Sequence, residues 1–376
     1  ARTIKSSYAT GAVTGAGYDM GGLVGRSDGA LNIYGSYYGG ASVTGTSYDV
    51  GGLVGLASGA LDIRNSYVEK SGGTSAVQGT YYVGGLVGNA ASTLSVTADS
   101  SSLANYGASL APYSKANVTG TTANGSNAVY VGGLAGYVAG TTTITGATVS
   151  AATVTGAGGY VGGLIGGVGA TGTVTLKDDA FTGTTLSSTT TNGNYVGGLV
   201  GRSDGVLNIY ASTFSGTTLT ATGHDVGGLV GASTATLDIR NSYMGSSSAL
   251  QGTYYVGGLL GNLSGGTLTL QADSSSVSTY GASLTPYSAA SVSGTYGVGG
   301  LVGNMSVAGT LSDVYATGSV TGSTYGVGGL VGLMSGNLAR TIKSSYATGS
   351  VTGAGYDMGG LVGRSEGALN IYGSYY

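Results

Sequence analysis

An apolar residue followed by Gly-Gly-Leu-Val-Gly, or by a close variant of it, recurs eleven times along the 376 residues of this chain. The first glycine of each copy stands at Gly21, Gly51, Gly84, Gly132, Gly162, Gly197, Gly227, Gly257, Gly299, Gly328 and Gly359. A fixed period of about 20 to 50 residues is typical of solenoids and propellers. Because most copies lie about 30 residues apart, we expect a stack of similar coils rather than an ordinary globular domain.

Two further segments accompany each motif and have the alternation of β-strands. One reads Leu-x-Ile, or a close variant, with a polar middle residue, as at Leu31/Ile33, Leu61/Ile63, Leu94/Val96, Leu207/Ile209, Leu237/Ile239, Leu268/Leu270 and Leu369/Ile371. The other is a Val-Thr run that leads to the next motif, as at Val13, Val43, Val154, Val320 and Val351. No segment has a helical period. The sequence therefore predicts an all-β, right-handed parallel β-solenoid (β-helix) of about eleven coils, each with three short strands.

The residue before each Gly-Gly pair is Val or Met in all eleven copies, so we expect it to form an interior ladder. Strict alternation would place Val50 and the following Leu53 on opposite faces of a strand. We therefore expect the glycine pair to form a bulge or bend that turns both side chains inward. At the sharp corners of a coil the backbone often has a positive φ, which glycine adopts readily.

The coils are themselves grouped into a longer repeat. Residues 1–38 return as 339–376 with 36 of 38 positions identical, the exceptions being Ala12 against Ser350 and Asp28 against Glu366. We expect residues 1–376 to form one continuous solenoid cut from a longer array, with super-repeats at approximately 1–176, 177–338 and the start of the next at 339–376. Two related inserts, 89–131 and 262–298, lengthen the coils that hold them.

Composition excludes several classes of partner. Charged residues are 7% of the chain and the formal net charge is −3, so no basic field attracts nucleic acid or an anionic membrane. Glycine, serine or threonine interrupts every apolar run before it could span a bilayer, so we expect no membrane insertion in this segment. The chain has no cysteine and therefore no disulfide scaffold.

Catalytic, cofactor and metal sites are not expected. The single histidine, His224, stands where other coils carry tyrosine, and the interpretation we favour is a substitution within a tyrosine ladder. One histidine without cysteine cannot supply a hydrolase triad or a zinc site. The glycine-rich motif lacks the helix and lysine of a nucleotide-binding loop.

Carboxylates were the remaining candidates for chemistry. Asp62 and Asp238 lie five coils apart, roughly 24 Å at about 4.8 Å per coil, which is too far for paired catalysis. Asp19 and Asp49 lie in adjacent coils and could stack. For these two we favour a turn-making role at a corner over calcium binding.

Tyrosine is the unusual enrichment, with 29 residues against two phenylalanines. Every coil carries Tyr or His two or three residues before Gly-Gly, and rings stacked about 4.8 Å apart would form a favourable ladder. The alternative is contact with a glycan or protein through exposed rings.

The inserts hold the only prolines, Pro112 and Pro286, so we expect their tips to leave the sheet. The possible contact residues are Tyr106, Tyr113, Tyr280 and Tyr287.

The Gly-Leu-hydrophobic-Gly core of these motifs, preceded by a tyrosine-containing segment, resembles the GLUG motif of bacterial surface and secreted proteins. The resemblance covers essentially the whole chain, with Ala135 and Ile165 at the variable position of two copies. It implies a β-solenoid, an extracellular or cell-surface location and a non-catalytic role in a filamentous adhesin. The expected function is thus a stalk or fibre that associates with neighbouring repeats or copies of itself. A glycan- or protein-binding module is the alternative, and a polysaccharide-active enzyme is the remote one.

Overall fold

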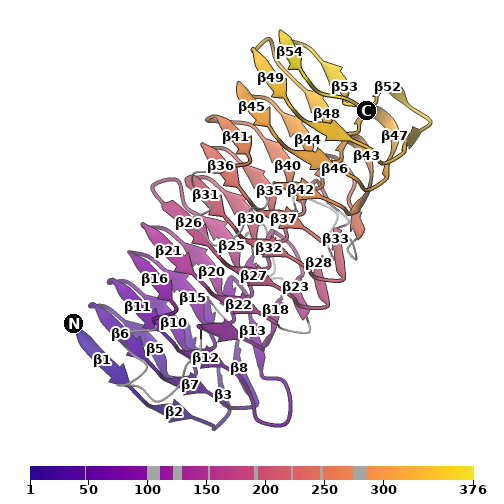
Figure 1. Cartoon of the computed structure of the whole chain (residues 1–376). Coiled ribbons are helices and arrows are strands. Elements are labelled where there is room, and N and C mark those ends of the chain that lie inside the picture. Colours follow the sequence, from indigo (N-terminus) through magenta and orange to yellow (C-terminus); the bar gives the residue numbers. More distant parts are fainter. Residues whose placement is uncertain are drawn as a thin grey trace.

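The computed structural model describes residues 1–46, 48–99, 111–121, 129–150, 153–189, 194–221, 223–245, 249–273 and 286–376. These residues form an all-β parallel solenoid of about eleven turns, in which the chain winds from one end of a rod to the other (Figure 1). The predicted fold class is confirmed.

One coil shows the pattern that the others repeat. It consists of β10 (Val54–Ala57), β11 (Leu61–Arg64), β12 (Tyr67–Val68), β13 (Ala76–Gly79) and β14 (Tyr82–Gly84). The coil therefore has five strand segments, whereas the sequence pattern predicted three. The extra segments arise because each glycine motif is divided between two strands, as between β9 (Asp49–Gly51) and β10, and because the two-residue β12 is too short to show alternation.

Equivalent segments of successive coils pair in parallel and build four sheets within the described part of the chain. Sheet A has twelve strands, from β1 (Arg2–Lys5) to β54 (Leu369–Tyr372), and contains the Leu-x-Ile segments. Sheet B has eleven two-residue strands, from β2 (Tyr8–Ala9) to β50 (Tyr346–Ala347). Sheet C joins the Val-Thr and pre-glycine segments, and sheet D has eleven strands, from β5 (Val24–Ser27) to β53 (Val362–Ser365).

Register is the same from coil to coil, so like side chains stack. Leu61 lies between Leu31 and Leu94, and these positions face a core that runs through the whole rod. Asp62 and Arg64 alternate outward on the same strand. Burial of the apolar ladders is the main stabilising contribution, since no coil could bury its apolar face alone.

The glycine pair turns both of its neighbours inward, as predicted. Val50 and Leu53 are both fully buried on either side of Gly51 and Gly52. These glycines do not have a positive φ, and the left-handed residues, several glycines among them, lie at other corners of the coil. Glycine is required here by close approach: a β-carbon on Gly52 would lie 2.1 Å from the carbonyl oxygen of Gly85 in the next coil.

The left-handed corner lies directly after the sheet A strand. Its residues have φ between 47° and 67° and are Ser6, Gly35, Asn65, Gly146, Asp178, Ala211, Asn241, Asp313, Ser344 and Gly373. A buried hydroxyl follows in several coils and joins one corner to the next: the amide of Ser36 donates to Oγ of Ser66 at 3.1 Å. This corner turns the chain from sheet A into sheet B.

Candidate functional site

Two rows of tyrosines stack along sheet B. In the first row the ring centroids of Tyr8, Tyr37, Tyr67 and Tyr113 follow one another at 5.3, 5.0 and 4.7 Å. The second row contains Tyr243, Tyr287, Tyr315, Tyr346 and Tyr375, at 4.9 to 5.1 Å. The rings are nearly parallel, so each row is an offset stack whose faces are largely covered by its neighbours. The sequence carried a signal for these rows that we missed, because Tyr37, Tyr67, Tyr243 and Tyr375 each stand six residues after the Leu of a Leu-x-Ile segment.

Two of the predicted contact residues belong to these rows. Tyr113 begins β17 (Tyr113–Ser114) and Tyr287 begins β42 (Tyr287–Ser288), so both are coil residues and not insert tips. The other two, Tyr106 and Tyr280, lie outside the described residues.

The expectation that Pro112 and Pro286 mark projecting tips is also wrong. Each proline directly precedes a sheet B strand, where its missing N–H is not needed for the ladder. Its carbonyl oxygen still accepts a bond from the next coil, from the amide of Thr148 at 3.1 Å and of Tyr315 at 3.4 Å. Much of the predicted insert 89–131 likewise consists of coil strands: β16 (Leu94–Thr97), β17 and β18 (Asn117–Gly120) are in normal register.

The predicted ladder before the glycine pairs is confirmed along sheet C. Tyr48 stacks on Tyr81 with centroids 4.4 Å apart. His224 stacks on Tyr254 at 4.5 Å and 13°, in the place of a tyrosine. Tyr160 and Tyr195 stand two residues before the glycine pair instead of three, in register with Asp225, and form a neighbouring row at 5.2 Å. His224 is thus a ladder residue.

Surface hollows follow the first sheet B row. One of about 280 Å³ is lined by Tyr37, Tyr67 and Glu69, together with Thr10, Gly39 and Ser71. A second of about 290 Å³ lies where the row steps from Tyr113 down to Thr148, and Lys115 lines it too.

A charged group separates the two hollows. Glu69 accepts a hydrogen bond from the Tyr113 hydroxyl and lies 2.6 Å from Lys115 Nζ. The lysine and the tyrosine hydroxyl lower the pKa of the Glu69 carboxyl, so it is ionised at neutral pH. This edge of the rod combines aromatic rings with polar groups that could hydrogen-bond a ligand.

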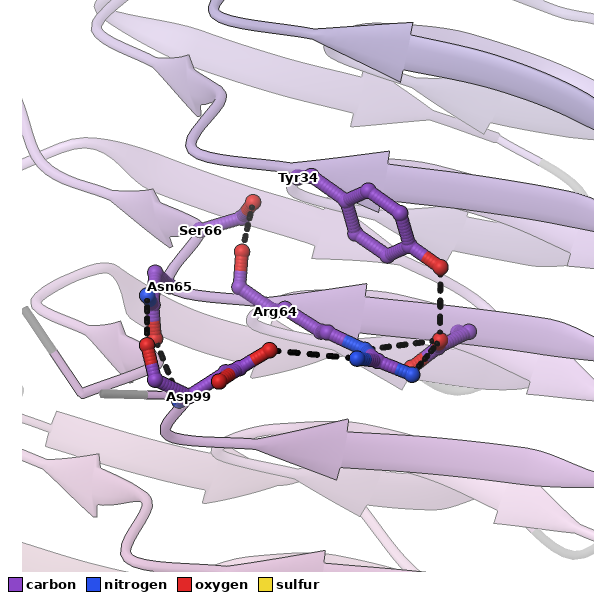
Figure 2. A network of polar contacts seen from close by, with 6 residues as sticks. Tyr34, Arg64, Asn65, Ser66 and Asp99 are labelled. Carbon is purple, nitrogen blue, oxygen red and sulfur yellow. Dashed lines mark hydrogen bonds and ion pairs between the residues drawn. The ribbon is translucent and has the colours of Figure 1, made fainter. Parts of the chain in front are cut away.

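Asp62 and Asp238 each belong to a polar network that holds the start of an insert. Figure 2 shows the first: Arg64 is paired with Asp62 at 2.8 Å and with Asp99 at 3.1 Å, while Tyr34 donates to Asp62 at 2.8 Å. Asn65 exchanges two hydrogen bonds with the backbone of Asp99, both at 2.8 Å. The same contacts recur five coils later around Arg240, where the paired carboxylates are Asp238 and Asp273. These carboxylates therefore have a structural partner.

The carboxylates before the glycine pairs are in a different situation. Asp49 is 6% exposed, and its Oδ1 has no hydrogen-bond partner. Burial raises the pKa of Asp49 to about 7, with a further contribution from Asp19, while Asn89 and Arg26 lower it. Burial also raises the pKa of Asp225 to about 7. A turn-making role, predicted for Asp49, is wrong because its carboxylate bonds no backbone amide.

No family model matches this chain, and neither the curated proteins nor the solved structures contain a significant match to it. Over the residues that the structure describes, no group of three or more His, Cys, Asp and Glu side chains is placed to hold a metal ion. The same residues form no helix that is long and apolar enough to cross a bilayer.

Proposed function

We propose that this chain is a structural repeat region, a stalk or fibre-forming segment of a secreted cell-surface adhesin or extracellular filament. This proposal is supported by the continuity of the sheets and of the apolar core along the chain. Sheet A runs through twelve strands from Arg2 to Tyr372 within the described residues, and the apolar core beside it forms a single cluster. A rod in which every coil is bonded to both neighbours transmits force along its axis without a hinge.

The near-identity of residues 1–38 and 339–376 supports an array of such units. Residues 339–376 occupy the last coil in the same register that residues 1–38 occupy in the first, with Ile342 stacked on Ile371 as Ile4 is on Ile33. Because residues 339–376 repeat residues 1–38, the coil that follows residues 1–38 could stack in the same way after residues 339–376. Addition of further super-repeats therefore lengthens the rod without a new type of contact.

A tandem chain tests this proposal. Joining a second copy of residues 39–376 after Tyr376 continues the repeat, and the rod should lengthen from roughly 50 Å by nearly the same amount, given about 4.8 Å per coil. Negative-stain electron microscopy and small-angle scattering measure the length. Two separate bodies joined by a bend would contradict the rod.

Glycan binding along sheet B is the second candidate function. It is favoured by the two hollows that flank Glu69, which combine the rings of Tyr67 and Tyr113 with hydrogen-bonding groups. Aromatic rings beside polar groups suit the apolar and hydroxyl faces of a sugar. Binding of the isolated rod to a glycan array, lost on Tyr113→Ala and Glu69→Gln, would support it. No binding by the native rod would leave the structural role alone.

A further inference from the structure

Three oxygen-bearing side chains from three successive coils meet beside the first, second and third glycine motifs. Asp19 in β4 (Asp19–Gly21) and Asp49 in β9 (Asp49–Gly51) are register partners in parallel strands, so their carboxylates point the same way one strand spacing apart. Asn89, in β15 (Val87–Ala90), lies beside Asp49.

Two side-chain oxygens of this group are buried without the hydrogen-bond partner that a buried polar atom normally has. Oδ1 of Asp49 and Oδ1 of Asn89 are both buried without a hydrogen bond, and Asp49 itself is 94% buried, being 6% exposed. A buried polar atom without a partner costs roughly 1 to 3 kcal/mol, and a buried carboxylate costs more. Two oxygens without hydrogen-bond partners, beside the carboxylate of Asp19, are well suited to bind a cation.

The nearby arginine does not supply that charge to Asp49. Arg26 makes its short contact with Asp28, at 2.7 Å, and a longer one with Asp19, at 3.5 Å. Its side chain is 53% exposed. Arg26 therefore pairs with the more exposed carboxylates and leaves Asp49 without an ion pair.

An equivalent position five coils later holds a buried carboxylate with different neighbours. Asp225 has Tyr195 as the register partner in the preceding coil instead of a second carboxylate. Its Oδ2 accepts a hydrogen bond from Nδ2 of Asn262 at 3.0 Å. The amide oxygen of Asn262 in turn accepts from Asn304 at 3.0 Å. The amide oxygen of Asn262 thus has a hydrogen-bond partner, whereas that of Asn89 has none.

We propose that Asp19, Asp49 and Asn89 form a binding site for a divalent cation that prefers oxygen ligands, with Ca²⁺ as the best fit. Carboxylate and amide oxygens are the ligands that Ca²⁺ takes in proteins, and water completes its six to eight positions. The ion joins three successive coils and removes the repulsion between the two carboxylates. This site is independent of the stalk or fibre role.

Luminescence of Tb³⁺, a Ca²⁺ analogue, tests the site directly. Tyr82 is the register partner of Asp49 in the next coil and is placed to sensitise the emission of an ion bound there. The native chain at pH 7.5 should show saturable, tyrosine-sensitised emission that Ca²⁺ competes away. Asp49→Asn should weaken the affinity about tenfold or more, since it removes a charged ligand.

Two further variants separate this site from general surface binding. Arg26→Gln removes a competing positive charge and should tighten binding. Asp225→Asn is the matched control, because it changes a carboxylate of equal depth without a second one beside it, and should leave the affinity unchanged. Circular dichroism confirms that each variant is folded, and Asp19→Asn replaces Asp49→Asn if the latter is not.

Thermal unfolding distinguishes an ion from a proton shared by the two carboxylates. Ca²⁺ should raise the midpoint of the native chain and leave that of Asp49→Asn unmoved. Equal Tb³⁺ affinity in the native chain and Asp49→Asn would overturn the proposal. A midpoint that responds to pH near 7 but not to Ca²⁺ would overturn it as well, in favour of a shared proton.

Discussion

Gly198 lies against the ring of Phe214: a β-carbon on the glycine would stand 2.7 Å from Cδ2 of that ring and 1.9 Å from the carbonyl oxygen of Gly228. The second glycine of each motif faces the interior residue of sheet B in this way, whether that residue is Phe181, Met244 or Tyr38. The motif therefore sets the width of the solenoid, because it lets two backbones and a large side chain share one corner.

Gly198→Ala should consequently be among the most damaging small substitutions in the rod. The carbonyl of Gly228 is backbone and cannot turn aside, so we expect a loss of at least about 2 kcal/mol in the free energy of unfolding. Gly73→Ala is the control, since its nearest neighbour would be a lysine side-chain carbon at 3.9 Å. Urea unfolding measures both, and equal losses would contradict the close-packing role.

Ala211 holds the left-handed corner after sheet A with φ of 47°, a conformation that strains any residue with a β-carbon. Ala211→Gly should raise the free energy of unfolding by roughly 0.5 to 1 kcal/mol, because relief of strain exceeds the entropy that glycine loses. The same change at Ala139, which is not left-handed, should lower it by a similar amount. Effects of the same sign at both positions would argue against the corner strain.

Asp225 makes the rod's stability depend on pH. An unfolded aspartate titrates near 3.9, whereas burial raises the pKa of the folded Asp225 to about 7. Between these values the folded chain holds a proton that the unfolded chain has released. The free energy of unfolding therefore falls as pH rises from about 4 to about 7 and is level above that.

Asp225→Asn removes this dependence and keeps an acceptor for the amide of Asn262. The variant should be more stable than the native chain at pH 8, by up to about 4 kcal/mol, and nearly equal to it at pH 4. Denaturant unfolding of both chains across this range gives the difference, in which the other carboxylates cancel. A difference that is constant with pH would show that Asp225 does not titrate in this range.

The sheets differ in how far they could be predicted from the sequence. Leu61 and Ile63 alternate with polar residues, so the period alone predicts sheet A and its buried face. Sheet B escapes such reasoning, because its interior position holds Tyr38, Ser114 or Phe181 and is defined only by the glycine opposite.

The candidate sites depended even more on neighbouring coils. Asp49 and Asp225 precede the same motif, and both have an asparagine beside them in the next coil, Asn89 and Asn262. What separates them is the register partner one coil earlier, which is Asp19 in one case and Tyr195 in the other. The sequence of the motif itself does not identify these neighbours, because they are set by the register between coils. The tyrosine row that includes His224 was predictable because stacking follows from the repeat itself.

Arg340 is the one arginine fully enclosed in the described core, at a position where most other coils have leucine. Gly309 precedes it in the ladder and leaves room for the longer side chain. The guanidinium donates to the carbonyl oxygens of Met305, Val307, Ser335, Gly336 and Leu338. It thus ties the loop of its own coil to the coil before it.

Arg340→Met preserves much of the apolar stem but removes every one of these donors. We expect it to lower the free energy of unfolding by more than about 2 kcal/mol, because buried carbonyl oxygens lose their partners. Arg2→Met is a closely matched control: the residues that follow, Thr3-Ile4-Lys5, repeat as Thr341-Ile342-Lys343, but Arg2 is exposed. That variant should change stability by no more than a few tenths of a kcal/mol. Similar losses from both substitutions, measured by urea unfolding, would mean that the arginine acts through local strand preference and not through its cage of carbonyls.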